Sequence, residues 1–205
     1  MAKPKIGIIY YSMFGNTYKM AKAVCGGVNE EGGEALLYTV PDLLPESVIS
    51  SNESIKKAKE AQAKVKIAKA ADTEELDGII LGSPTRFGNM CAQLRNFMDQ
   101  TGAQWIKGSL INKPAGVFCC TASLHGGQET TLVSMAFTLI HHGAIIVGVP
   151  YSIKELVNTK TGGTPYGPTA VVGENADQSP TESDLKIAGE LGKRVTFIAK
   201  KLSGL

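Results

Sequence analysis

The stretch "KIGIIYYSMFGNTYKMAKAV", residues 5 to 24, joins a hydrophobic run to a helical pattern through a short polar loop. Its first residues are almost continuously apolar, which favours a strand buried on both faces of a parallel sheet. Beyond the loop, Met20, Val24 and Val28 recur every fourth residue, the spacing of one helix face. A buried strand that leads straight into a helix is typical of an α/β fold.

The same alternation of apolar runs and helical periodicity continues to the end of the chain. The further strand candidates are 34–40, 78–83, 115–121 and 144–150. Five β-α units in a row predict a parallel sheet with right-handed crossovers and helices on both faces. The last helix follows "SPTE", which predicts Ser179 as its N-cap and Glu182 as the capping-box partner.

Two segments stand outside this pattern and are read as insertions in a single domain spanning residues 1–205. Residues 46–71 are rich in alanine and lysine and predict an exposed helix or a mobile insertion, with a solvated basic face. Residues 152–180 are too long for a simple connection in a compact domain, so we expect them to have a function.

Composition sets broad limits on function. The 205 residues are 43% hydrophobic and 20% charged with a net charge of +2, which is ordinary for a globular protein and argues weakly against nucleic-acid binding. The four cysteines form no C-x-x-C pair and match no zinc spacing, so we expect no metal. The absence of a long apolar run or a signal peptide predicts a cytoplasmic protein with reduced thiols and no membrane span.

The loop after the first strand has the parts of a phosphate site. Ser12, Asn16 and Thr17 supply side-chain donors, Gly15 permits a tight turn, and a helix N-terminus follows. The loop lacks the Gly-Lys-Ser/Thr of a Walker A motif, the Rossmann glycine pattern, and the cysteine and arginine of a low-molecular-weight phosphatase. By itself it fits a capped turn as well as it fits a phosphate cradle.

The loop after the third strand adds a cation and an aromatic ring. Thr85, Arg86 and Phe87 lie at the expected strand end, and Asn89 is placed to cap the next helix. In open α/β sheets, ligands bind outside the carboxyl ends of the strands. An arginine beside an aromatic there suits a flat, partly anionic ligand. A surface arginine next to a core phenylalanine is an equally good interpretation of these residues alone.

Several motifs together resemble one family. "YYSMFGNT", "GSPTRFGNM", "LRNFMDQTGAQW", "HHG" and "GGTPYG", in this order and spacing, resemble the WrbA-type NAD(P)H:quinone oxidoreductases. The resemblance implies a flavodoxin-like five-stranded parallel sheet of order 2-1-3-4-5 and one non-covalent FMN per subunit. It also implies a homotetramer (a dimer of dimers) that reduces quinones by two electrons with NADH or NADPH, in a ping-pong hydride transfer through FMN.

The resemblance also implies the site residues. Phe14 occupies a position where relatives often have a tyrosine that faces the nicotinamide, and Trp105 would wall the substrate cavity. His141 would approach the flavin, in a tetramer from a neighbouring subunit. Arg86, His141 and Trp105 are therefore the expected catalytic residues. The expected cofactor-binding residues are Ser12, Met13, Phe14, Gly15, Asn16, Thr17, Pro84, Thr85, Arg86, Phe87, Gly88, Cys120, Thr121, Ala122, Ser123, His125, Gly126 and His141.

One loop departs from the family pattern. Relatives usually read Ser-Thr-Gly-Thr followed by a glycine run, whereas this chain reads "CCTASLHGG" from residue 119. Fewer glycines restrict how closely a backbone can pass a ligand. His125 is new there and is either a donor to the flavin or a plain polar loop residue. This departure keeps open a non-catalytic regulatory protein of the same fold as an alternative to the enzyme. A flavodoxin-like electron carrier is a further alternative, against which the near-neutral charge, Trp105 and "GGTPYG" argue.

Overall fold

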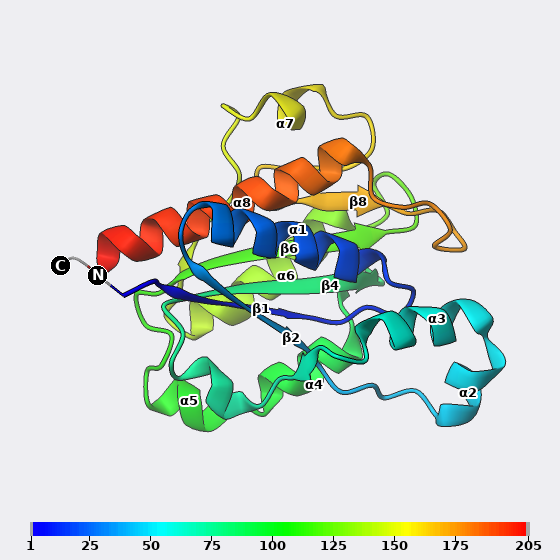
Figure 1. Ribbon diagram of the computed structural model, residues 1–205, viewed down its shortest axis with the longest axis horizontal. Helices are drawn as coiled ribbons and strands as arrows, with labels where there is room; N and C mark the ends of the chain where they lie inside the picture. The colour runs from blue at the N-terminus through cyan, green and yellow to red at the C-terminus, as the bar shows by residue number, and fades with distance from the viewer. Residues whose placement is uncertain (1, 204–205) are drawn as a thin grey trace.

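The computed structural model describes residues 2–203, which form a central sheet between two layers of helices (Figure 1). The sheet has eight strands, where the sequence predicted five. The strands are β1 (Lys5–Tyr10), β2 (Glu34–Thr39), β3 (Lys66–Ile67), β4 (Gly78–Arg86), β5 (Asn89–Met90), β6 (Pro114–Thr121), β7 (Ile145–Ile146) and β8 (Thr169–Val171). Their order is β3-β2-β1-β4-β6-β7, with β5 beside β4 and β8 beside β6.

All strand pairs are parallel except the short hairpin of β4 and β5. The run 144–150, predicted as one strand, provides only the two residues of β7. β7 pairs with the start of β6 and β8 pairs with its end. The edge next to β6 is therefore shared by two short strands, and the long insertion between them loops out. In Figure 1 this insertion carries α7 above the layer of α8.

The helices connect the strands and cover both faces of the sheet. They are α1 (Asn16–Glu30), α2 (Glu46–Ser51), α3 (Glu53–Gln62), the 3₁₀ helix η1 (Ala70–Thr73), α4 (Ala92–Asp99), α5 (Gly102–Ile106), α6 (Gln128–His141), α7 (Lys154–Asn158) and α8 (Glu182–Leu202). A hydrophobic core lies on each face of the sheet. β1 contributes to both cores, because successive side chains of a strand point to opposite faces. Ile8 and Tyr10 pack with α1 and α8, while Ile9 and Tyr11 belong to the core formed with α4 and α6.

Two predicted helix starts are wrong by a few residues. The N-cap of α8 is Thr181, whose hydroxyl accepts a hydrogen bond from the Asp184 N–H, and Ser179 and Glu182 are not the capping pair. The Asp184 carboxylate also accepts a hydrogen bond from the Thr161 hydroxyl in the preceding insertion. This additional bond explains why the helix is capped by Thr181 and Asp184 and not by Ser179 and Glu182. The N-cap of α4 is Cys91, and Asn89 lies instead in the hairpin strand β5.

Helices α1 and α8 lie side by side and approach each other unusually closely (Figure 1). A Cβ atom added to Gly27 would lie 1.9 Å from the Gly189 carbonyl oxygen, and one on Gly192 would lie 2.2 Å from the Val24 carbonyl oxygen. Glycine at these positions lets the two backbones touch. The contact fixes α1, and therefore its N-terminus, against the sheet.

Candidate cofactor site

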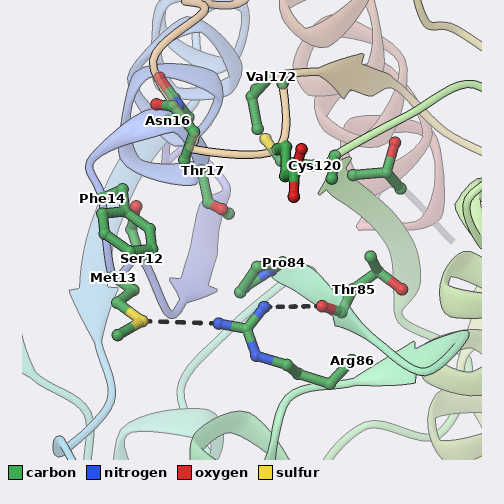
Figure 2. Close-up of a pocket in the computed structure, with 15 residues that line it drawn as sticks. Ser12, Met13, Phe14, Asn16, Thr17, Pro84, Thr85, Arg86, Cys120 and Val172 are labelled. Carbon is green, nitrogen blue, oxygen red and sulfur yellow. Dashed lines mark hydrogen bonds between the residues drawn. The ribbon is translucent and has the colours of Figure 1, made fainter.

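A cavity of about 140 Å³ opens at the carboxyl ends of β1, β4 and β6, where the fold predicts a ligand site (Figure 2). The lining residues are Ser12, Met13, Phe14, Asn16, Thr17, Pro84, Thr85, Arg86, Cys120, Thr121, Ala122, Val172, Gly173, Glu174 and Ala176. Most of the predicted phosphate-loop and strand-end residues are thus brought together around one space.

The loop after β1 presents free donors to this cavity. Gly15 adopts a left-handed conformation, with φ of 88°, and serves as the N-cap of α1 without any side-chain capping bond. Among residues 2–203, no acceptor bonds the backbone N–H groups of residues 13 to 17. The Ser12 side chain is buried, yet its hydroxyl has no partner in the described chain. Free buried donors of this kind need an outside acceptor.

The electrostatics of the loop favour an anion. α1 has fifteen residues and no acidic side chain in its first turn, so its positive dipole end is not neutralised. The side chain of Asn16 is used for structure, because its amide donates to the Ala176 carbonyl at 2.8 Å. Arg86 and Glu174 are the charged residues among the cavity lining, and their formal charges cancel. An anion bound here would therefore take most of its contacts from neutral donors.

Arg86 crosses from β4 to the loop after β1 (Figure 2). Its guanidinium donates to the Thr85 carbonyl at 2.8 Å and contacts the Met13 sulfur at 3.6 Å. The Thr85 hydroxyl in turn accepts from the Thr131 hydroxyl at 2.7 Å, which anchors the strand end to α6. The guanidinium is thus held over the opening between the two loops, where a flat ligand would meet it.

The loop after β6 divides into a part that lines the cavity and a part that does not. Cys120, Thr121 and Ala122 line it. The predicted residues Ser123, His125 and Gly126 form an exposed turn beyond the cavity lining. His125 sits there in a left-handed conformation, with φ of 57°. In the single chain, the interpretation of His125 as a plain loop residue fits better.

Four other predicted residues lie away from the cavity. Phe87 and Gly88 form the tip of the β4–β5 hairpin, and the Phe87 ring is fully exposed. Trp105 and His141 border a separate surface hollow between α4, α5 and α6, where the indole N–H donates to the His141 carbonyl at 2.7 Å. Two of the three expected catalytic residues therefore lie apart from Arg86 within one chain.

Two groups of residues at the site escaped the sequence interpretation. Val172, Gly173, Glu174 and Ala176 close one side of the cavity from the loop after β8. A glycine also follows β1, β4 and β6, so the glycine at 173 within "VVGEN" is a signal that could have found this loop. α3 contacts the back of the phosphate loop, and lysine-rich composition gave no hint of that contact.

The cysteines beside the cavity are poor nucleophiles. Burial raises the pKa of the Cys120 thiol to about 12, and burial also raises the pKa of Cys119 well above its ordinary value. Both thiols therefore stay protonated at neutral pH.

Within residues 2–203, no cluster of side chains could hold a metal ion, and no helix combines the length and apolarity needed to cross a membrane.

Comparison with solved structures confirms the flavodoxin-like fold. A WrbA-like flavodoxin from Agrobacterium tumefaciens superposes with a TM-score of 0.65 at 22% identity, covering 97% of this chain and 99% of that one. Oxidised flavodoxin 1 from Bacillus cereus superposes with a TM-score of 0.58 at 20% identity, covering 93% and 96%. At this identity the likeness concerns the fold alone.

Sequence comparison shows the family. The family model described as NADPH-dependent FMN reductase matches residues 4–156. Proteins named NAD(P)H dehydrogenase (quinone) from Trichlorobacter lovleyi and Aromatoleum aromaticum are 46% and 44% identical to this chain. The first alignment covers 97% of this chain and 98% of its relative, and the second covers 97% of each. The chain therefore belongs to the NAD(P)H dehydrogenase (quinone) family of flavodoxin-like proteins.

Proposed function

We propose that the protein is an FMN-dependent NAD(P)H:quinone oxidoreductase that binds FMN in the cavity at the carboxyl ends of β1, β4 and β6. The observation that carries the proposal is the loop 12–17: five of its six residues line the cavity, and its backbone N–H groups from 13 to 17 and the Ser12 hydroxyl have no partner in the described chain. That donor set suits a phosphate. Family membership supplies the reaction, and the relatives' names point to quinones and NAD(P)H.

The residues of the cavity divide into two ends. The loop 12–17 and the N-terminus of α1 would hold the phosphate of FMN, while Thr85, Arg86 and the segment 120–122 would border its ring. Bound FMN would supply the capacity to accept two electrons from NAD(P)H and to deliver them to a quinone. The chain itself would bind and orient the ring and place the Arg86 cation beside the ring end.

Arg86→Ala should weaken FMN binding about tenfold, because a charge-assisted contact contributes roughly 1.5–3 kcal/mol. Flavin fluorescence titration of the apoprotein measures the dissociation constant. Arg194→Ala is the matched control, since Arg194 lies on α8 and donates to the Gly148 carbonyl, away from the cavity. Equal FMN affinity for the Arg86 variant and the control would mean that the ring binds elsewhere.

We also propose that the protein works as a homotetramer in which Trp105 and His141 complete the site of a neighbouring subunit. Support comes from an apolar face around those two residues: Phe87 is fully exposed, and Phe137 and Ile140 on α6 are 61% and 53% exposed. Large apolar side chains gathered on one face mark interaction surfaces.

The free thiols Cys25, Cys91, Cys119 and Cys120 support a reducing, cytoplasmic location.

Phe137→Glu should break this assembly, because burying a carboxylate in an apolar interface costs desolvation free energy that no hydrogen bond or opposite charge offsets. Sedimentation velocity should show smaller species, and quinone turnover should fall with the loss of the neighbour's His141. Phe197→Glu is the control, because Phe197 is 49% exposed on α8. A Phe137 variant that keeps the parent's sedimentation coefficient would contradict the proposed interface.

The proposed enzymatic activity is tested by measuring the steady-state oxidation of NADH and NADPH with a benzoquinone as acceptor. We expect turnover to require added FMN. FMN binding without turnover would favour the electron carrier instead.

A further inference from the structure

The lysine-rich helix α3 packs against the back of the phosphate loop. Its buried residues are Ile55, Ala58 and Gln62. A Cβ atom added to Gly15 would lie 3.6 Å from the Ala58 Cβ, which is ordinary van der Waals contact. The helix is therefore in direct contact with the loop that presents the free N–H groups.

Two side chains of α3 converge on one atom of that loop. The Lys59 ammonium donates to the Ser12 carbonyl oxygen at 3.1 Å, and the Gln62 amide donates to the same oxygen at 3.3 Å. The Gln62 side chain is buried, and its amide nitrogen also donates to the Ala58 carbonyl at 2.7 Å, which fixes its orientation. A carbonyl held by two donors on one rigid helix cannot rotate freely.

The Lys59 ammonium is itself fixed from three sides. It pairs with the Asp42 carboxylate at 2.6 Å and lies 4.4 Å from the centre of the Tyr11 ring. The Tyr11 hydroxyl donates to both carboxylate oxygens at 3.1 Å. Burial acts to raise the pKa of Asp42, but hydrogen bonds from Lys59 and from the Leu44 N–H outweigh it and hold the pKa below its ordinary value. Asp42 is therefore ionised at neutral pH and anchors Lys59.

The orientation of the Ser12 carbonyl sets the direction of the next N–H group. The described chain contains no cis peptide bonds, and in a trans peptide the carbonyl and the following N–H point in opposite directions. With the Ser12 oxygen turned toward α3, the Met13 N–H is turned away from it. Ser12 and Met13 line the cavity, whereas Lys59 and Gln62 do not. The loop thus stands between α3 and the cavity.

We propose that Lys59 and Gln62 are positioning residues of the phosphate site: by holding the Ser12 carbonyl, they aim the Met13 N–H at the phosphate of FMN. The inference rests on the proposed function, since it assumes that FMN binds in this cavity. It gives the insertion 46–71 a role in cofactor affinity, although none of its residues lines the cavity.

The test compares FMN with riboflavin, which has the same ring and ribityl chain but no phosphate. Lys59→Met and Gln62→Met remove the donors while keeping unbranched side chains of similar length. Lys56→Met is the matched control, because Lys56 is an exposed residue of the same helix. Dissociation constants of both flavins are measured by fluorescence quenching with apoprotein, well below its unfolding temperature.

We expect each of the two variants to bind FMN about tenfold more weakly while riboflavin affinity stays within twofold, and the control to change neither. A purely structural role would weaken both flavins equally and would overturn the inference. Unchanged FMN affinity in both variants would overturn it as well and leave the proposed function intact. A parent protein that binds no FMN would instead overturn the proposed function and this inference together.

Discussion

Gly27→Val should lower the free energy of unfolding by about 3 kcal/mol, the upper range for overpacking a rigid contact. A Cβ atom at this position would lie 1.9 Å from the Gly189 carbonyl oxygen, far inside contact distance. The obstacle is backbone, so no side-chain rotation can relieve it. Separation of α1 from α8 would also displace the N-terminus of α1, so FMN affinity should fall together with stability.

Urea unfolding of the apoprotein measures the effect, and Gly26→Ala is its control. Gly26 is the preceding residue of the same helix, and a Cβ added there meets nothing within 4 Å. Alanine should raise the free energy of unfolding by roughly 0.5–1 kcal/mol, because glycine in a helix interior is unfavourable. Similar midpoints for the two variants would contradict the close packing of α1 and α8.

Ser12→Ala should stabilise the apoprotein and weaken FMN binding, two effects of opposite sign. The buried Ser12 hydroxyl has no partner in the described chain, so its removal should raise the free energy of unfolding by about 1 kcal/mol. In the complex the same hydroxyl would bond the phosphate, and its loss should weaken FMN about tenfold.

Ser83→Ala is the matched control for the serine at position 12. Ser83 is equally buried, but its hydroxyl donates to the Pro84 carbonyl at 2.7 Å and accepts from the Cys91 N–H at 2.9 Å. Its removal should therefore destabilise the apoprotein by roughly 1–3 kcal/mol. Thermal unfolding of both apoproteins decides the matter: destabilisation by Ser12→Ala would mean that its hydroxyl serves the fold and not a ligand.

The sequence predicted the elements whose pattern is local. The apolar run of β1 and the four-residue spacing of α1 were sufficient, because burial on one or both faces leaves a period in the sequence. The start of α8 was misplaced because "SPTE" and "TESD" both match a capping box, and the long-range bond from Thr161 to Asp184 favours the second. The fifth strand was overextended since Gly148 abuts the Pro165 carbonyl of the insertion, a contact with no local signal.

In the candidate site, too, the residues with a local sequence signal were predicted and those placed by long-range contacts were not. Ser12 to Thr17 and Thr85 to Arg86 were predicted because each group lies at the end of a recognisable strand, and all of them except Gly15 line the cavity. The support from Lys59 and Gln62 was missed because it joins residues about fifty positions apart through a helix that looked solvated. Trp105 and His141 came from family resemblance, and in a single chain they lie outside the cavity, so their role depends on the proposed tetramer.

The most direct test of the account is reconstitution of the purified protein with FMN, followed by assay of NADH and NADPH oxidation with a benzoquinone. We expect about one flavin per chain after removal of excess FMN, and hydroquinone formation that depends on the bound flavin. A protein without flavin absorbance after reconstitution would contradict the cofactor site, and with it the proposed enzyme.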